Sequence, residues 1–106
     1  MKIIITETQN RRLQVLRRIT SADWDLILEI VDEGLDNDDP CDFRNYESYL
    51  KRILHDSART YLNHYFLEEE EKSEDYKILF EYLCHLIYVR LWEDIKTYYE
   101  DKKEDC

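Results

Sequence analysis

The chain has 106 residues, enough for one domain with a modest hydrophobic core and too few for two. With 43% hydrophobic and 38% charged residues it has the material to fold, and a single glycine and a single proline argue against a turn-rich sandwich or barrel. The formal net charge of −10 disfavours direct binding to nucleic acid or to an anionic membrane surface. We therefore expect one helical domain over residues 1–106.

The number and spacing of the cysteines indicate whether the protein resides in a reducing or an oxidising compartment. Cys41, Cys84 and Cys106 are an odd number without CxxC spacing. This pattern favours free thiols in a reducing interior over a disulfide framework. No segment has the length and apolarity of a membrane span or a signal-peptide core. The sequence predicts a soluble cytoplasmic protein with no membrane contact.

The N-terminal segment 2–6, with its three isoleucines, is the one β-like stretch. No second strand is available to pair with it, so we expect residues 1–6 to form an extended arm over the helices. Two alternatives stay open: pairing with another copy or with a partner, and fraying. Thr6 and Gln9 have the spacing of a capping box that would open a first helix.

A second helix is predicted after Thr20 and Asp23, which again have capping spacing. Its apolar residues recur at helical intervals: Trp24, Ile27, Leu28, Val31 and Leu35. Gly34 stands where a helix C-cap favours a left-handed residue, which predicts the end of the helix there. Residues 36–43 are acidic and form the clear loop of the chain.

A third helix is expected from about Arg44 to Leu67, because apolar side chains recur at three-and-four spacing. The carboxylates of Glu68, Glu69, Glu70 and Glu71 are unfavourable at a helix C-terminus, so the helix should end before them. Ser73 then caps a final helix that reaches about Lys103. The charged residues 100–106 are expected to fray. The predicted fold is all-α, a compact four-helix bundle with an extended N-terminal arm.

The final helix carries a broad apolar arc and also a second, sparser stripe. The large apolar members of the stripe are Ile78, Tyr82, Val89, Trp92 and Tyr99. If the stripe is bare, its Trp and Tyr residues are of the types enriched at interface hot spots. Burial under a neighbouring element is the alternative.

The acidic loop is the best candidate for a metal site. Asp36, Asp38, Asp42 and Glu47 match positions 1, 3, 7 and 12 of an EF-hand-like register. Position 5 is a proline and position 6 a cysteine, where the motif needs an oxygen ligand and a glycine. A solvated loop whose aspartates cap the next helix is therefore favoured, and we expect neither a metal nor another cofactor.

Catalytic motifs are absent from the sequence. It contains no GxSxG, P-loop, GxGxxG or HExxH pattern, and one glycine cannot build a phosphate-binding loop. A small, tightly patterned bundle also leaves little room for a pocket with converging polar groups. We expect a non-enzyme.

The opening Lys2-Ile3-Ile4-Ile5-Thr6-Glu7-Thr8-Gln9, followed by Arg12-Leu13, resembles the start of many small uncharacterised proteins of tailed bacteriophages. In those proteins Ser is usual where Thr8 stands here. The segment 39–43, which precedes a Tyr-containing helix, is also similar to a segment of such proteins. The resemblance implies a phage origin and a helical body, and it implies no catalytic residues.

Together these features predict a small acidic protein that binds another protein, as a phage accessory factor that binds or inhibits a host or defence protein in the host cytoplasm. The partner would have a basic surface. Carboxylates of residues 68–71, with Glu74 and Asp75, or of the 36–42 loop, could mimic nucleic acid in a basic groove. One alternative is a homo-oligomeric structural or virion-associated component, such as a homodimer paired through residues 3–5. A second alternative is a calcium-binding module that uses residues 36–47.

Overall fold

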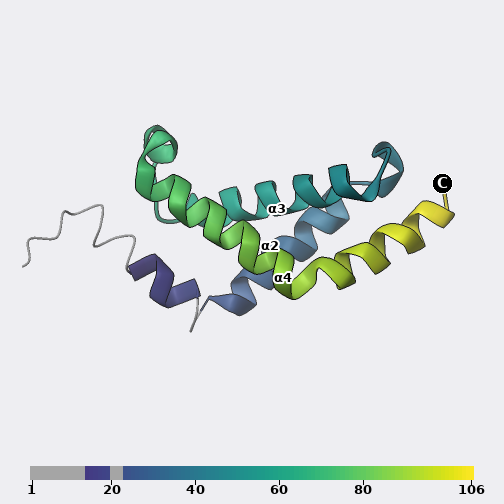
Figure 1. The fold of residues 1–106 in the computed structure, drawn as a ribbon, viewed down its shortest axis with the longest axis horizontal. Coiled ribbons are helices and arrows are strands. Elements are labelled where there is room, and N and C mark those ends of the chain that lie inside the picture. Colours follow the sequence, from purple (N-terminus) through teal and green to yellow (C-terminus); the bar gives the residue numbers. More distant parts are fainter. Residues whose placement is uncertain (1–13, 20–22) are drawn as a thin grey trace, which may run out of the picture.

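The computed structural model describes residues 14–19 and 23–106, which form an all-α bundle. A helical segment over residues 14–19 is followed by α2 (Trp24–Asn37), α3 (Tyr46–Leu62) and α4 (Glu74–Glu104) (Figure 1). Two short 3-10 helices, η1 (Pro40–Asp42) and η2 (Glu68–Lys72), lie between them. These residues contain no strand. The predicted arm over residues 1–6, the Thr6–Gln9 capping box and Thr20 lie outside the described residues.

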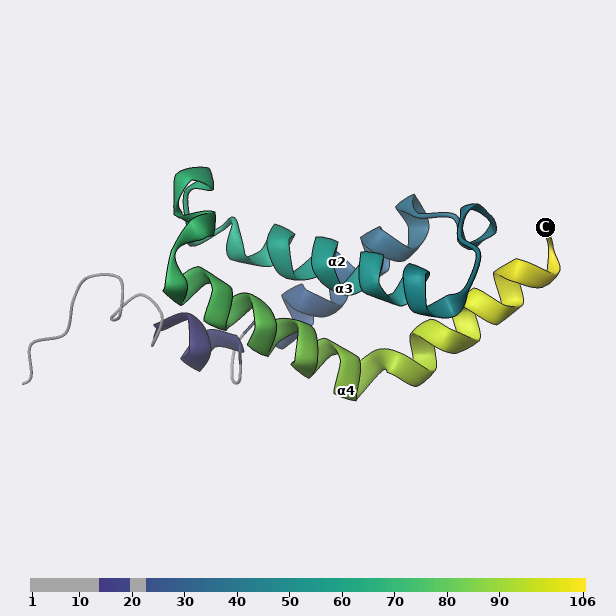
Figure 2. The same ribbon diagram turned by 45° about the horizontal axis from the view of Figure 1, so that its top comes forward.

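The central helix of the bundle is α3, which packs against both α2 and α4. Figures 1 and 2 show α4 running beside α3 in the opposite direction, so the end of α4 lies near the start of α3. At this end α4 also contacts η1, and at its other end it contacts η2. Four helical elements and their short connections thus bury one shared core.

The limits of α3 are set by its flanking residues. The side chain of Asn45 accepts a hydrogen bond from the Ser48 backbone N–H at 2.8 Å and so caps the start of the helix. The helix ends at Leu62, earlier than the predicted Leu67, because the chain turns and returns Phe66 to the core. There Phe66 packs edge-on against the ring of Tyr76 at 5.6 Å. The predicted start of α4 is confirmed, since the Ser73 hydroxyl accepts from the Tyr76 N–H at 3.2 Å.

The prediction that Gly34 ends α2 is wrong. Gly34 has no positive φ, and the helix continues through it to Asn37. The glycine instead lies where α2 faces α3. A Cβ at this position would lie 3.7 Å from Ile53 Cδ1 and 3.8 Å from Ser57 Oγ. Both are ordinary van der Waals distances, so the position has room for a methyl group.

The buried face of α4 changes direction along the helix. Tyr76, Leu79, Leu83 and Ile87 are buried in the first half, and the next buried residue is Ile95. At 100° per residue, the eight-residue step from Ile87 to Ile95 turns the buried face by about 80°. The rotation brings Tyr99, with 7% exposure, into contact with the rings of Tyr46 and Tyr49. The prediction of Tyr99 as part of a bare stripe is therefore wrong.

The C-terminal residues are held in place. Residues 100–104 continue α4, and Cys106 forms a disulfide with Cys41 of η1, with the two Cα atoms 5.8 Å apart. The predictions of a frayed tail and of three free thiols are both incorrect. The physical reason is that α4 extends past the start of α3 and so reaches η1. Cys84 is the one free cysteine of the three.

Candidate partner-binding surface

Four apolar side chains of the predicted stripe are open to solvent. Their exposed fractions are 42% for Ile78, 38% for Tyr82, 55% for Val89 and 37% for Trp92. They lie on the side of α4 away from the buried residues of its first half, such as Leu83. We call these four residues the α4 stripe. Large side chains grouped in this way on one helix face are typical of interaction surfaces.

The charges beside the α4 stripe are mostly acidic. Glu81 and Glu93 are exposed near the two ends of the stripe, and Glu100 is exposed about two turns beyond Glu93. His85 and Lys96 lie on the same side of the helix and are also exposed. Rim carboxylates of this kind favour a partner with basic side chains.

A groove between α3 and α4 borders the stripe at Trp92. Its volume is about 450 Å³, and its apolar lining includes Tyr46, Leu50, Leu54 and Tyr88. The Tyr46 hydroxyl donates a hydrogen bond to the Trp92 carbonyl oxygen at 2.6 Å, which ties the two helices together here. The sequence did not predict this groove, because its lining comes from two helices. A helical wheel describes one helix at a time and does not show how two helices are aligned.

The predicted carboxylate row of residues 68–71 is partly used within the protein. The Glu70 side chain accepts a hydrogen bond from the Leu67 N–H at 3.0 Å. The Glu71 carboxylate pairs with Arg59 of α3 at 3.2 Å. Glu69 and Glu74 are exposed. The carboxylates of Glu70 and Glu71 are therefore engaged within the protein and do not belong to a row of free charges.

A straighter carboxylate row lies on α2. Asp25, Glu29, Asp32 and Asp36 are exposed and follow the i, i+4, i+7, i+11 spacing of one helix face. No ion pair or hydrogen bond within residues 14–19 and 23–106 involves these four carboxylates. This row could have been found in the sequence, because its carboxylates recur at the same helical spacing as the apolar residues of α2.

The proposed calcium ligands lie on different elements. Asp36 is in the last turn of α2, Asp42 is in η1, and Glu47 is in the first turn of α3. In the part of the chain that the structure describes, no group of three or more His, Cys, Asp or Glu side chains is placed to hold a metal ion, and Asp38 belongs to no such group. Capping in this segment comes from Asp39, whose carboxylate accepts from the Cys41 N–H at 3.0 Å.

The most strongly perturbed carboxyl group is Asp23, at the start of α2. Burial alone would raise its pKa, but hydrogen bonds from Arg18, Tyr61 and Tyr65 outweigh burial and lower it to about 2. The two phenols donate to Asp23 Oδ2 at 2.6 and 2.7 Å, and Arg18 binds both carboxylate oxygens. Through these bonds Asp23 joins residues 14–19 and the start of α2 to Tyr61 of α3 and to Tyr65 beyond its end, so the cluster has a structural role.

Comparison with protein-family models, with curated proteins and with solved structures finds no match for this sequence. None of the helices in the described ranges is long and apolar enough to cross a membrane.

Proposed function

We propose that this chain is a non-enzymatic protein-binding protein whose α4 stripe contacts another protein. The observation that supports the proposal is the exposure of Ile78, Tyr82, Val89 and Trp92 along one side of a single helix. Trp and Tyr supply large contact areas at protein interfaces, and more than a third of the surface of Tyr82 and of Trp92 is open to solvent here.

The partner that fits has a basic surface around an apolar groove. Glu81 and Glu93 flank the stripe, and the whole chain carries a net charge of −10. Mimicry of nucleic-acid charge is part of the proposal, and the carboxylates of Asp25, Glu29, Asp32 and Asp36 on α2 support it better than residues 68–71 do. They follow one helix face, and none has an ion pair or hydrogen bond within residues 14–19 and 23–106. The proposed role is that of a phage accessory factor acting on a host or defence protein.

The proposed location is the host cytoplasm. Protein disulfides are rare in the cytoplasm, where thiol systems keep cysteines reduced. The proposal therefore requires that the protein functions with Cys41 and Cys106 reduced for at least part of the time.

The test is affinity capture from host lysate with the full chain. Wild type is compared with the double variant Tyr82→Ala/Trp92→Ala, after circular dichroism has shown that both are helical. Leu26→Ala is the matched control, because Leu26 is an equally exposed apolar residue on α2, at 37%. We expect a partner that is captured by wild type and the control and is lost with the double variant. Equal capture by all three proteins would refute the role of the stripe.

A homodimer is the second candidate, because the same apolar stripe is suited to a self-complementary, two-fold contact. Light scattering coupled to size-exclusion chromatography separates the two candidates. A wild-type dimer that the folded double variant converts to a monomer supports self-association. A monomeric wild type leaves the stripe free for a foreign partner.

A further inference from the structure

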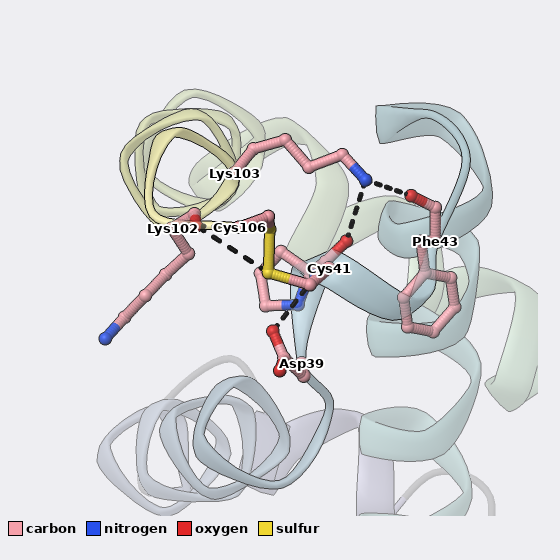
Figure 3. Close-up of a disulfide and its surroundings, with 7 residues drawn as sticks. Asp39, Cys41, Phe43, Lys102, Lys103 and Cys106 are labelled. Carbon is pink, nitrogen blue, oxygen red and sulfur yellow. Dashed lines mark hydrogen bonds between the residues drawn. A yellow bond between two sulfur atoms is a disulfide. The ribbon is translucent and has the colours of Figure 1, made fainter.

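The end of α4 is attached to η1 by a small group of contacts that we call the clasp. It consists of the Cys41–Cys106 disulfide and of Lys103, whose ammonium donates hydrogen bonds to the carbonyl oxygens of Pro40 and Phe43 (Figure 3). The two cysteines are 65 residues apart in the sequence. The clasp thus joins two segments that no helix connects directly.

Both cysteines of the clasp are exposed. An exposed disulfide is open to attack by a thiolate from solution, which is the requirement for exchange. The third cysteine, Cys84, is a free thiol and is partly buried. Burial raises the pKa of Cys84 to about 11, and its sulfur lies 3.6 Å from the Leu54 carbonyl oxygen. Cys84 therefore contributes almost no thiolate at neutral pH and does not compete for the disulfide.

The surroundings of the disulfide also suit the reduced state. The Sγ atoms of Cys41 and Cys106 lie 3.9 and 3.6 Å from the carbonyl oxygen of Lys102. After reduction, this oxygen is a ready acceptor for a thiol proton. The hydrogen bonds of Lys103 involve no sulfur atom. Opening the disulfide therefore removes the covalent attachment of the last turns of α4 to η1, and it does not directly break the two hydrogen bonds of Lys103.

We propose that Cys41–Cys106 is a reversible thiol–disulfide exchange site for small thiols of the glutathione class, and that its redox state sets how firmly the last turns of α4 are held on η1. The proposal concerns this chain alone and does not depend on its partner. It also supplies the reduced form that a cytoplasmic role requires.

The exchange proceeds in two balanced steps. A glutathione thiolate attacks one sulfur, the protein S–S bond breaks, and a mixed disulfide and one protein thiolate form. A second glutathione thiolate attacks the glutathione sulfur of the mixed disulfide, which releases the other protein thiolate and oxidised glutathione. The protein gains two electrons and two protons, and oxidised glutathione reverses the reaction.

The first experiment measures the equilibrium. The full chain is incubated in buffers with different ratios of reduced to oxidised glutathione, free thiols are trapped with an alkylating reagent, and the labels are counted by mass spectrometry. We expect Cys41 and Cys106 to be labelled together, with the reduced-to-oxidised ratio rising tenfold for each tenfold rise in [GSH]²/[GSSG]. A disulfide that stays closed at the most reducing ratio would overturn the proposal.

The second experiment measures hydrogen exchange in the oxidised and reduced proteins. We expect amides of residues 98–104 to exchange more than tenfold faster after reduction, through local opening of the last turns of α4. The centres of α2 and α3 should remain the most slowly exchanging amides of the chain, although the stability of the whole domain falls. Cys41→Ser/Cys106→Ser should exchange like the reduced protein under all conditions, and Cys84→Ser should respond like wild type. Identical exchange in both redox states, or loss of protection throughout the chain on reduction, would show a purely structural disulfide.

Discussion

The cluster around Asp23 makes a quantitative prediction about stability. The pKa of this carboxyl is lowered from 3.8 to about 2 in the folded protein, and its side chain is only 7% exposed. One pKa unit corresponds to 1.36 kcal/mol, so the ionised carboxylate contributes about 2 kcal/mol to folding. Asp23→Asn should therefore lower the free energy of unfolding at pH 7 by about 2 to 3 kcal/mol, because the amide cannot replace the charge that faces Arg18.

The pH dependence gives this prediction its sharpest test. A carboxyl whose folded pKa is lowered stabilises the protein above its unfolded pKa, and this contribution is lost as the pH falls from 3.8 towards 2. Urea unfolding followed by circular dichroism should thus show a difference between wild type and Asp23→Asn that is large at pH 7 and small at pH 2. Glu29→Gln, on the exposed face of α2, should stay within about 0.5 kcal/mol of wild type at pH 7. A difference that is the same at both pH values would refute the electrostatic reasoning.

Three further predictions concern packing and covalent structure, and each is measured by urea unfolding. The double variant Cys41→Ser/Cys106→Ser should lose about 4 kcal/mol, because the disulfide closes a loop across 65 positions; a loss below about 1 kcal/mol would contradict this. Gly34→Ala should stabilise the protein by about 0.5 to 1 kcal/mol, since the position is helical and has room for a methyl group; destabilisation would mean that α2 and α3 are closer than described. Tyr46→Phe should cost about 1 kcal/mol because it removes a hydrogen bond to the α4 backbone, whereas Tyr49→Phe should be neutral or stabilising because its buried hydroxyl has no partner in the described residues. Equal costs for the two tyrosines would contradict this assignment.

Helical spacing accounts for most of what the sequence could predict. In α3 the buried residues include Tyr49, Leu50, Ile53, Ser57 and Tyr61, which follow the three-and-four spacing of one helix face. Such a pattern is local, so it does not depend on knowing which helices lie alongside. The caps at Asn45 and Ser73 are local too, although Asn45 could be assigned only after the true start of α3 was known.

The disulfide depends on information that is not local. Cysteine count and spacing favoured free thiols, because neither reports how far α4 extends beyond α3. The lengths hold the missing signal: α3 has 17 residues and α4 has 31. At 1.5 Å per residue, an antiparallel α4 is longer than α3 by about 20 Å, which is enough to pass the start of α3 and reach η1. The sequence hid this excess, because a helix predicted from about Arg44 to Leu67 is shorter than α4 by only about 10 Å.

The extent of the α4 stripe follows from the rotation of the buried face along the helix. A single helical wheel assumes that neighbours lie in one direction for the whole length, and α4 violates this assumption between Ile87 and Ile95. Tyr99 belongs to the stripe on the wheel, but it enters the core because the second half of α4 faces the start of α3. The accessible apolar surface therefore ends at Trp92 and begins at Ile78, a length of about 21 Å at 1.5 Å per residue. The four side chains of the stripe stand at i, i+4, i+11 and i+14, so they can all insert into one apolar groove of a partner. A groove of about this length therefore suits the stripe better than a flat surface does.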